Sequence, residues 1–230
     1  TCTDGIALIE LCRPERHNAL TPALLQGLLM RLEQAAQGDV AAVVLQARGS
    51  SFCTGGDLSG FLAHWEEIET YSSELVGLLN DTVLALRALP QPIVAAVQGW
   101  VTGGGLGLVL GADRVVLAPD ARFAPYYVDV GFSPDGGWTA LLPQFIGRRQ
   151  AEELQYRNAV LDARGAVRLG LATEIAQHQP VQVQARQWAV EVSGKTGHSV
   201  RSTKRLLNGD PEPLRKALET ERRAFIDCIT

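Results

Sequence analysis

Short runs of apolar residues alternate, over roughly the first half of the chain, with stretches in which apolar residues recur every three or four positions. The runs lie at 5–11, 40–47, 93–98 and 113–118, and each has the length of a β-strand. Those at 40–47 and 93–98 are apolar almost throughout. That pattern is typical of strands buried on both faces of a parallel sheet.

The stretches between these runs have helical periodicity. Thr21 is a suitable N-cap for a helix that starts at Pro22, and leucines at 24, 25, 28, 29 and 32 form one apolar face of that helix. A longer helix is predicted over 61–89, because two prolines follow it, and a short one begins at Leu106. Strands that alternate with helices predict an α/β fold with a parallel sheet.

The pattern becomes mostly helical after residue 131. Helices are predicted over 148–157, 162–169, 181–192, 199–207 and 212–226. We therefore expect an α/β core over 1–190 and a helical C-terminal segment over 191–230. Because no linker rich in serine and glycine separates them, the segment is expected to pack on the core or on a neighbouring subunit.

Composition and charge exclude several classes of protein. The 230 residues are 46% hydrophobic and 20% charged, an ordinary balance for a globular domain. A net charge of -4 argues against nucleic acid as a partner, and no apolar run is long enough for a membrane span. The four cysteines lie at no zinc-ligand spacing, so we predict no metal site. We interpret them as reduced thiols of a cytoplasmic protein without a signal peptide.

Two glycine-rich loops follow buried strands and carry the candidate chemistry. The first includes Gly55 and Gly56, and the second is the triplet 103–105. The triplet lacks the glycine spacing of a dinucleotide-binding loop, and no Lys-Ser/Thr pair of a P-loop follows it. Unpaired backbone N–H groups remain, and one from each loop could stabilise an oxyanion between them. The alternative is that both loops are tight turns without chemistry.

Four segments, in order, resemble the crotonase superfamily, which is the enoyl-CoA hydratase/isomerase family. They are 13–20 (RPERHNAL), 51–58 (SFCTGGDL), 92–107 (PIVAAVQG and GGGLG) and 131–137 (GFSPDGG). The resemblance extends to about residue 180. It implies a crotonase-like spiral of ββα units with a helical C-terminal segment, an acyl-CoA thioester as substrate, and assembly into a homotrimer or homohexamer. Coenzyme A is then part of the substrate, and no separate cofactor is expected.

The resemblance also implies roles for individual residues. The oxyanion donors would be the backbone N–H groups of Gly56 and Gly104. The residues implied to bind coenzyme A are Arg16, His17, Thr54, Asp57 and Leu58. The segment 191–230 would cover the acyl-CoA site and contribute to oligomerisation.

The acid and base residues decide which reaction an enolate-stabilising site performs. Hydratases resembling this chain use two glutamates, and here Gly107 and Tyr127 stand at those positions. Asp135 occupies the position of the acid in several isomerases. Our hypothesis is therefore an enoyl-CoA isomerase in which Asp135 moves a proton along the acyl chain. Tyr127 and Trp138, with nearby aromatic residues, are expected to form an apolar substrate wall that desolvates Asp135.

Several alternatives remain open from the sequence. Asp135 is also a favoured N-cap for the helix predicted after it. The chain is alternatively a hydratase with a non-standard acid/base, or a catalytically impaired acyl-CoA-binding protein. A dehydratase or decarboxylase acting on a carrier-bound thioester is a further possibility. An aryl-CoA dehalogenase ranks low, because the histidine it needs is replaced by Asn80 at the approximate position.

Overall fold

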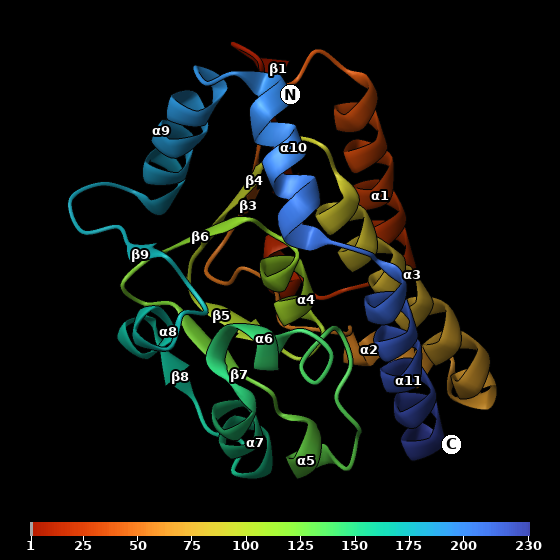
Figure 1. Cartoon of the computed structure of the whole chain (residues 1–230). Coiled ribbons are helices and arrows are strands. Elements are labelled where there is room, and N and C mark those ends of the chain that lie inside the picture. The colour runs from red at the N-terminus through yellow and green to blue at the C-terminus, as the bar shows by residue number, and fades with distance from the viewer. Residues whose placement is uncertain (1) are drawn as a thin grey trace.

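The computed structural model describes residues 2–230 and contains two β-sheets (Figure 1). The larger has six strands in the order β1-β2-β3-β4-β6-β9, and the smaller has three in the order β5-β7-β8. The strands are β1 (Cys2–Thr3), β2 (Ile6–Leu11), β3 (Ala42–Ala47), β4 (Ile93–Val97), β5 (Trp100–Thr102), β6 (Arg114–Leu117), β7 (Arg122–Ala124), β8 (Leu161–Asp162) and β9 (Glu174–Ile175).

Helices connect and cover these strands. The α-helices are α1 (Pro22–Gln37), α2 (Leu58–Ala63), α3 (Ile68–Ala88), α4 (Gly105–Leu110), α5 (Tyr127–Val130), α6 (Leu142–Ile146), α7 (Arg148–Tyr156), α8 (Ala163–Leu169), α9 (Val181–Ser193), α10 (Gly197–Asn208) and α11 (Glu212–Ile229). Two 3-10 turns are η1 (Pro14–Arg16) and η2 (Trp65–Glu67). None of the helices between residues 2 and 230 combines the length and the apolar character that crossing a membrane requires.

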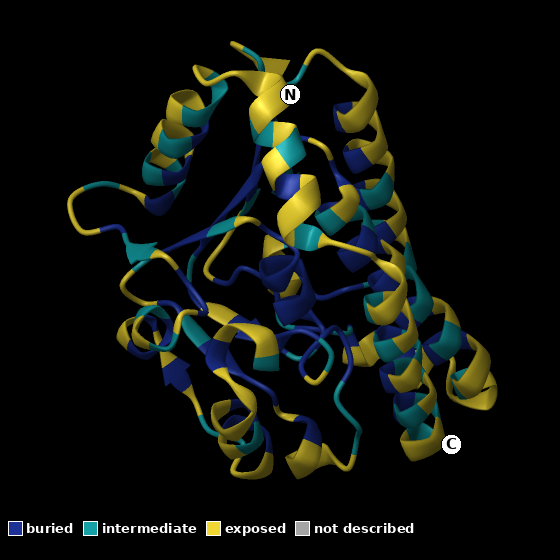
Figure 2. Ribbon diagram, viewed as in Figure 1, coloured by how far each residue is buried: buried dark blue, intermediate teal, exposed yellow. Residues whose placement is uncertain are grey.

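The four predicted strands form the middle of the large sheet. β2, β3, β4 and β6 are all parallel, and β1 pairs antiparallel with β2 at one edge. Val43 and Leu45 of β3 face the core shared with α1 and α3, whereas Ala42 and Val44 face α9. Both faces of the sheet are therefore buried (Figure 2), and the prediction of an α/β fold with a parallel sheet is confirmed.

Each central strand of the large sheet is followed by a short segment in a second layer. β4 leads directly into β5, and β6 leads into β7, which pairs with β5. Cys53, after β3, bridges Val101 of β5. The turn between β4 and β5 requires Gly99, because its φ is +57° and an added β-carbon would lie 1.8 Å from the carbonyl oxygen of Ser50. This repetition is the ββα spiral that the resemblance implies.

The helix predicted over 61–89 is divided in the structure. α2 ends at Ala63, and His64 has a non-helical backbone with φ -114° and ψ 30°. The Nδ1 of His64 donates a hydrogen bond to the Gly60 carbonyl oxygen, 2.9 Å away, and the His64 ring stacks on Tyr71. These local contacts turn the chain before α3 begins. The strands β5, β7 and β8 were not predicted as a second sheet, because runs of two or three residues have no measurable periodicity.

The helical C-terminal residues pack on the core. α11 lies along α3, and Asn80 of α3 donates a hydrogen bond to the Leu218 carbonyl of α11 (3.0 Å; Figure 1). Lys204 of α10 pairs with Asp113, 2.7 Å away, directly before β6 of the large sheet. The C-terminal helices α10 and α11 thus make direct contacts with α3 and with the residue before β6.

Candidate functional site

A cavity of about 330 Å³ lies where the two glycine loops meet. Gly56 and Gly104 both line it. The loops touch at Gly55, whose φ is +77°, and an added β-carbon there would lie 3.3 Å from the nitrogen of Gly104. Any side chain at Gly55 would therefore separate the loops. The structure brings together the two loops that the sequence placed about fifty residues apart.

The backbone N–H groups of Gly56 and Gly104 have no acceptor within residues 2–230. Leu20 bridges the first loop by donating to the Gly55 carbonyl (2.7 Å) and accepting from Asp57 (3.0 Å), which leaves the N–H of Gly56 unused. Gly104 precedes α4 and its N–H makes no hydrogen bond either. Two unpaired donors at one cavity are the arrangement that binds an anionic oxygen.

Asp135 lies at the same cavity and is 7% exposed. A β-carbon on Gly104 would lie 3.3 Å from Asp135 Oδ1, so the carboxyl group lies against the second loop. Burial raises the pKa of Asp135 to about 7, although the hydrogen bond from Tyr127 lowers it; the negative charge of Glu221 raises it further. Asp135 caps no helix, since α6 begins only at Leu142. Its carboxyl is thus a group that can exchange a proton near neutral pH.

Tyr127 is the hydrogen-bond partner of Asp135. Its hydroxyl donates to Asp135 Oδ1, and it also lies 3.3 Å from the Asp135 carbonyl oxygen. Burial and the neighbouring Asp135 raise the pKa of Tyr127 well above its ordinary value. The phenol therefore stays protonated and remains a donor to the carboxylate.

The loop after Asp135 is held by Glu221 of α11, a residue that the sequence analysis did not single out. Its carboxylate, 4% exposed, accepts from the N–H groups of Gly137 (2.7 Å), Thr139 (2.7 Å) and Ala140 (2.8 Å). It also accepts from the Thr139 hydroxyl (2.6 Å). The only signal in the sequence is position, because Glu221 shares a helical face with the buried Leu218 and Phe225.

The five residues implied to bind coenzyme A lie in or beside the first loop. Asp57 accepts from Arg13 (3.0 Å) and Arg16 (2.9 Å) and caps α2 at Ser59. Burial would raise the pKa of Asp57, but hydrogen bonds from Ser59, Arg16 and Arg13 hold it well below its ordinary value. The side chain of Arg16 is 48% exposed, so its guanidinium has surface free for a ligand.

Hydrogen bonds of His17 and Thr54 connect the segment that contains Arg16 to the first glycine loop. His17 has a left-handed backbone, φ 50°, and its Nδ1 is 3.1 Å from the Ser51 hydroxyl. Thr54 donates to the His17 carbonyl at 3.4 Å and lines the cavity. Leu58, 67% exposed, lies at the cavity with it. The structure brings these residues to one side of the cavity.

Trp138 lies elsewhere than in the predicted substrate wall. It is 1% exposed, does not line the cavity, and donates from its indole nitrogen to the Gly103 carbonyl at 2.7 Å. It also packs edge-on against Tyr127. A buried indole N–H needs an acceptor, and the glycine loop supplies one. Trp138 therefore supports the second loop from behind.

The apolar wall of the cavity comes from three parts of the chain. Phe61 of α2 and Phe132 both pack against Phe225 of α11, at ring centroid distances of 6.2 and 5.3 Å. Tyr126 and Tyr127 also line the cavity. Asn80 does not line it, because its amide is directed to α11.

The Asp135 loop fills the space beside Gly107, the position at which the resemblance implies a glutamate in hydratases. A β-carbon on Gly107 would lie 2.7 Å from the Gly136 carbonyl oxygen and 2.9 Å from Val83 Cγ2. Real β-carbons essentially never approach backbone oxygen so closely. The glycine at position 107 is therefore what allows the loop that carries Asp135 to pack this closely against α4.

Comparisons with known proteins point to one family. The family model described as enoyl-CoA hydratase/isomerase matches residues 1–230. A probable enoyl-CoA hydratase of Mycobacterium tuberculosis is 31% identical over 210 residues, which are 91% of this chain and 82% of that protein. The crystal structure of an enoyl-CoA hydratase from Bacillus halodurans superposes with a TM-score of 0.93 at 27% identity, covering 100% of this chain and 94% of the other.

The relatives do not share one reaction. A 4-chlorobenzoyl coenzyme A dehalogenase of an Arthrobacter species is 29% identical over 230 residues, covering 99% of this chain and 83% of that protein. A hydratase and a dehalogenase thus lie at similar sequence distance. The acid and base groups of the site have to decide between reactions.

Proposed function

The chain belongs to the enoyl-CoA hydratase/isomerase family of acyl-CoA-processing enzymes, and on this basis we propose that it is an enoyl-CoA isomerase. The observation that carries the proposal is Asp135, the one carboxyl among the described residues that line the cavity, beside two unpaired N–H donors. The two carboxylates of the hydratase design are absent, since Gly107 and Tyr127 stand at their positions.

In the proposed reaction, the N–H groups of Gly56 and Gly104 donate to the thioester oxygen of a 3-enoyl-CoA. Asp135, as carboxylate, removes a proton from the α-carbon, and the electron pair moves into the carbonyl to form a dienolate. Asp135 then returns the proton to the γ-carbon, which leaves the double bond conjugated with the thioester. One base serves both ends because the proton moves along one face of the chain.

The oxyanion donors supply the largest share of the rate. Loss of a single such donor lowers the rate of other enzymes by on the order of a hundredfold or more. Coenzyme A is proposed to lie beside Arg16, His17, Thr54, Asp57 and Leu58, with Arg16 toward a phosphate. The assembly into a homotrimer or homohexamer and the cytoplasmic location stay predictions.

The proposal is tested with two thioesters. A 3-enoyl-CoA is expected to gain the absorbance of a conjugated thioester, whereas crotonyl-CoA is expected to keep it. Loss of absorbance from crotonyl-CoA without conversion of the 3-enoyl substrate would identify a hydratase. Tight coenzyme A binding without turnover of either thioester would identify an acyl-CoA-binding protein.

Replacing Tyr127 by phenylalanine is expected to shift the pH profile of isomerisation upward. The base must be ionised, so kcat/KM should rise through the pKa of Asp135, about 7. The Tyr127 hydrogen bond lowers that pKa, and its loss raises the midpoint. Tyr126→Phe is the control, because no hydrogen bond of its hydroxyl occurs within residues 2–230, and its midpoint should equal that of the parent. An unshifted Tyr127→Phe profile would remove Asp135 as the titrating base.

Introducing glutamate at position 107 is expected to destabilise the protein without producing a hydratase. The side chain would enter space held by the Gly136 carbonyl and Val83. Overpacking of this kind lowers the free energy of unfolding by about 1–3 kcal/mol. Urea unfolding measures it, and Gly27→Glu on α1, where an added β-carbon meets nothing within 4 Å, is the control. Hydration of crotonyl-CoA by Gly107→Glu would contradict this account.

A further inference from the structure

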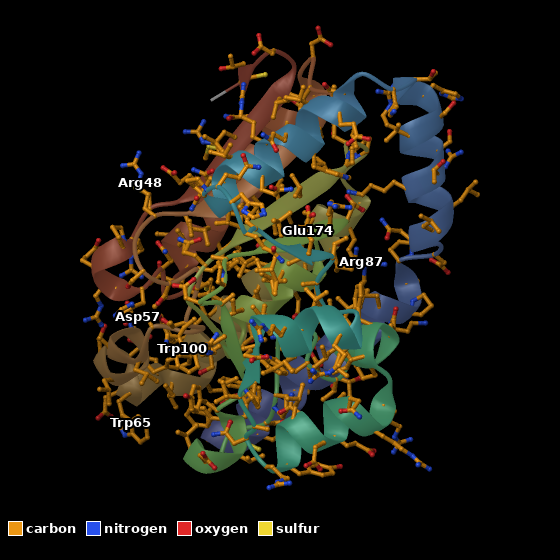
Figure 3. The ribbon with its side chains drawn as sticks, turned by 90° about the vertical axis from the view of Figure 1, so that its left-hand side faces the viewer. Arg48, Asp57, Trp65, Arg87, Trp100 and Glu174 are labelled. Carbon is orange, nitrogen blue, oxygen red and sulfur yellow. The ribbon has the colours of Figure 1, made fainter. Side chains whose placement is uncertain are left out.

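A second cavity, of about 600 Å³, lies between the end of α3, helix α10 and the turn that leads into α11. It shares no lining residue with the cavity at the two glycine loops, which is named the acyl cavity from here on. Figure 3 shows Arg87, which lines the second cavity, well separated from Asp57 and Trp100.

The lining of the second cavity is strongly basic. Its ionisable residues are Arg87, His198, Arg201, Lys204 and Arg205, against one acid, Asp210. The whole chain has a net charge of -4, so this excess of positive charge opposes the overall balance. Basic side chains gathered on a concave surface attract anions.

Part of this charge is explained by the fold. Lys204 pairs with Asp113 at 2.7 Å and donates to the carbonyl oxygens of Leu86 (3.3 Å) and Gln91 (3.0 Å). Asn208 donates to the Arg87 carbonyl at 2.7 Å. These bonds satisfy carbonyl groups at and after the C-terminus of α3, where cations are favoured. Lys204 and Asn208 therefore need no ligand.

Three guanidinium groups remain unexplained. Within residues 2–230, no carboxylate or other acceptor bonds to the side chain of Arg87, Arg201 or Arg205. Arg87 is half-buried; burial lowers the pKa of its guanidinium, and the charge of Asp113, which makes no hydrogen bond or ion pair with it within residues 2–230, raises it in part. Arg201 and Arg205 are four residues apart on α10, a spacing at which like charges destabilise a helix.

We propose that this cavity binds a small organic phosphate, with Arg87, Arg201 and Arg205 around its phosphate groups. The planar guanidinium matches phosphate oxygens with paired N–H donors, and three of them suit a multiply charged anion. Leu84, Leu141 and Leu214 line the same cavity and offer apolar surface to the organic part. The volume lies within the range of small-molecule sites.

The same chemistry occurs in two sources, a free nucleoside diphosphate and the phosphorylated adenosine end of a coenzyme A. Calorimetric titration of the full chain with ADP and with adenosine 3′,5′-bisphosphate separates them. In the Arg201→Gln/Arg205→Gln double variant, the affinity for the probe that the cavity binds is expected to fall at least tenfold. The probe that shows this loss identifies the source of the ligand. Both substituted residues are exposed, so the variant is expected to fold, which circular dichroism checks.

Arg164→Gln/Arg168→Gln is the matched control. These arginines are also exposed and four residues apart, on α8, and line neither cavity. Its affinity for either probe should equal that of the parent. The proposal is overturned by equal loss in both double variants, or by no binding of either probe at millimolar concentration. The second result would also follow if a neighbouring subunit fills the cavity, and it counts against the proposal in the same way.

Discussion

Asp135→Asn is expected to lower kcat for isomerisation of a 3-enoyl-CoA by about a hundredfold to ten-thousandfold, the range that a positioned general base contributes. The amide cannot accept the α-proton at neutral pH. It is nearly the same size as the carboxyl, so the two glycine loops should keep their positions. The absorbance of the conjugated thioester, followed over time at saturating substrate, measures the change in kcat.

Asp129→Asn is the control for this variant. Asp129 is exposed, does not line the acyl cavity and accepts a hydrogen bond from Asn158. Its kcat should stay within twofold of the parent, a margin set by roughly 0.4 kcal/mol. Isomerisation by Asp135→Asn at the parental rate would exclude the proposed mechanism.

Asp135→Asn is also expected to raise Tm at pH 8. The pKa of Asp135 in the folded protein, about 7, lies above its ordinary value of 3.8. Between these pH values the unfolded chain releases the proton while the folded chain retains it, so stability falls as pH rises through the window. Asparagine removes this penalty. Below pH 4 the Asp135 carboxyl is protonated in the folded and in the unfolded chain alike, so the gain in Tm should disappear.

Glu221→Ala is expected to lower the free energy of unfolding by about 3 kcal/mol or more, because three N–H groups of the Asp135 loop lose their acceptor. The loop also carries the proposed base, so kcat should fall with stability. Urea unfolding and the isomerase assay, on the same preparations, measure both effects. Glu219→Ala is the control, since Glu219 is an acid of the same helix whose ion pairs are with Arg222 and Arg223.

Glu221→Gln separates a positioning role from a purely structural one. Glutamine keeps one acceptor for the loop but removes the negative charge, which raises the pKa of Asp135. The pH midpoint of kcat/KM should therefore move below that of the parent. A residue that only anchors the loop would change the rate at every pH alike and leave the midpoint in place.

Much of the fold follows from local pattern. The runs at 40–47 and 93–98 are apolar on both alternating faces, and such strands are stable only when both faces are covered. Gly55 is required by a positive φ and by its contact with Gly104, so the motif that identified the loop is the one its geometry demands. Asp135 was predicted as the acid because it lies in the segment 131–137, which resembles the corresponding segment of the crotonase superfamily.

The partners of the buried groups depended on contacts between distant parts of the chain. Glu221 lies more than eighty residues after Asp135, and in the sequence it is one acid among several on an amphipathic helix. Trp138 was expected to face substrate, yet the nearest acceptor for its indole is Gly103. The free arginines at the second cavity were indistinguishable from surface charges.

The two glycine loops and the lone aspartate were readable from the residues in order, because backbone conformation and strand burial depend on neighbours along the chain. The enclosure of that aspartate, its bond to Tyr127, its support by Glu221 and the filling of the space at Gly107 were set by the folded arrangement. A buried polar group must find its partner in space, and sequence distance does not restrict which residue that is.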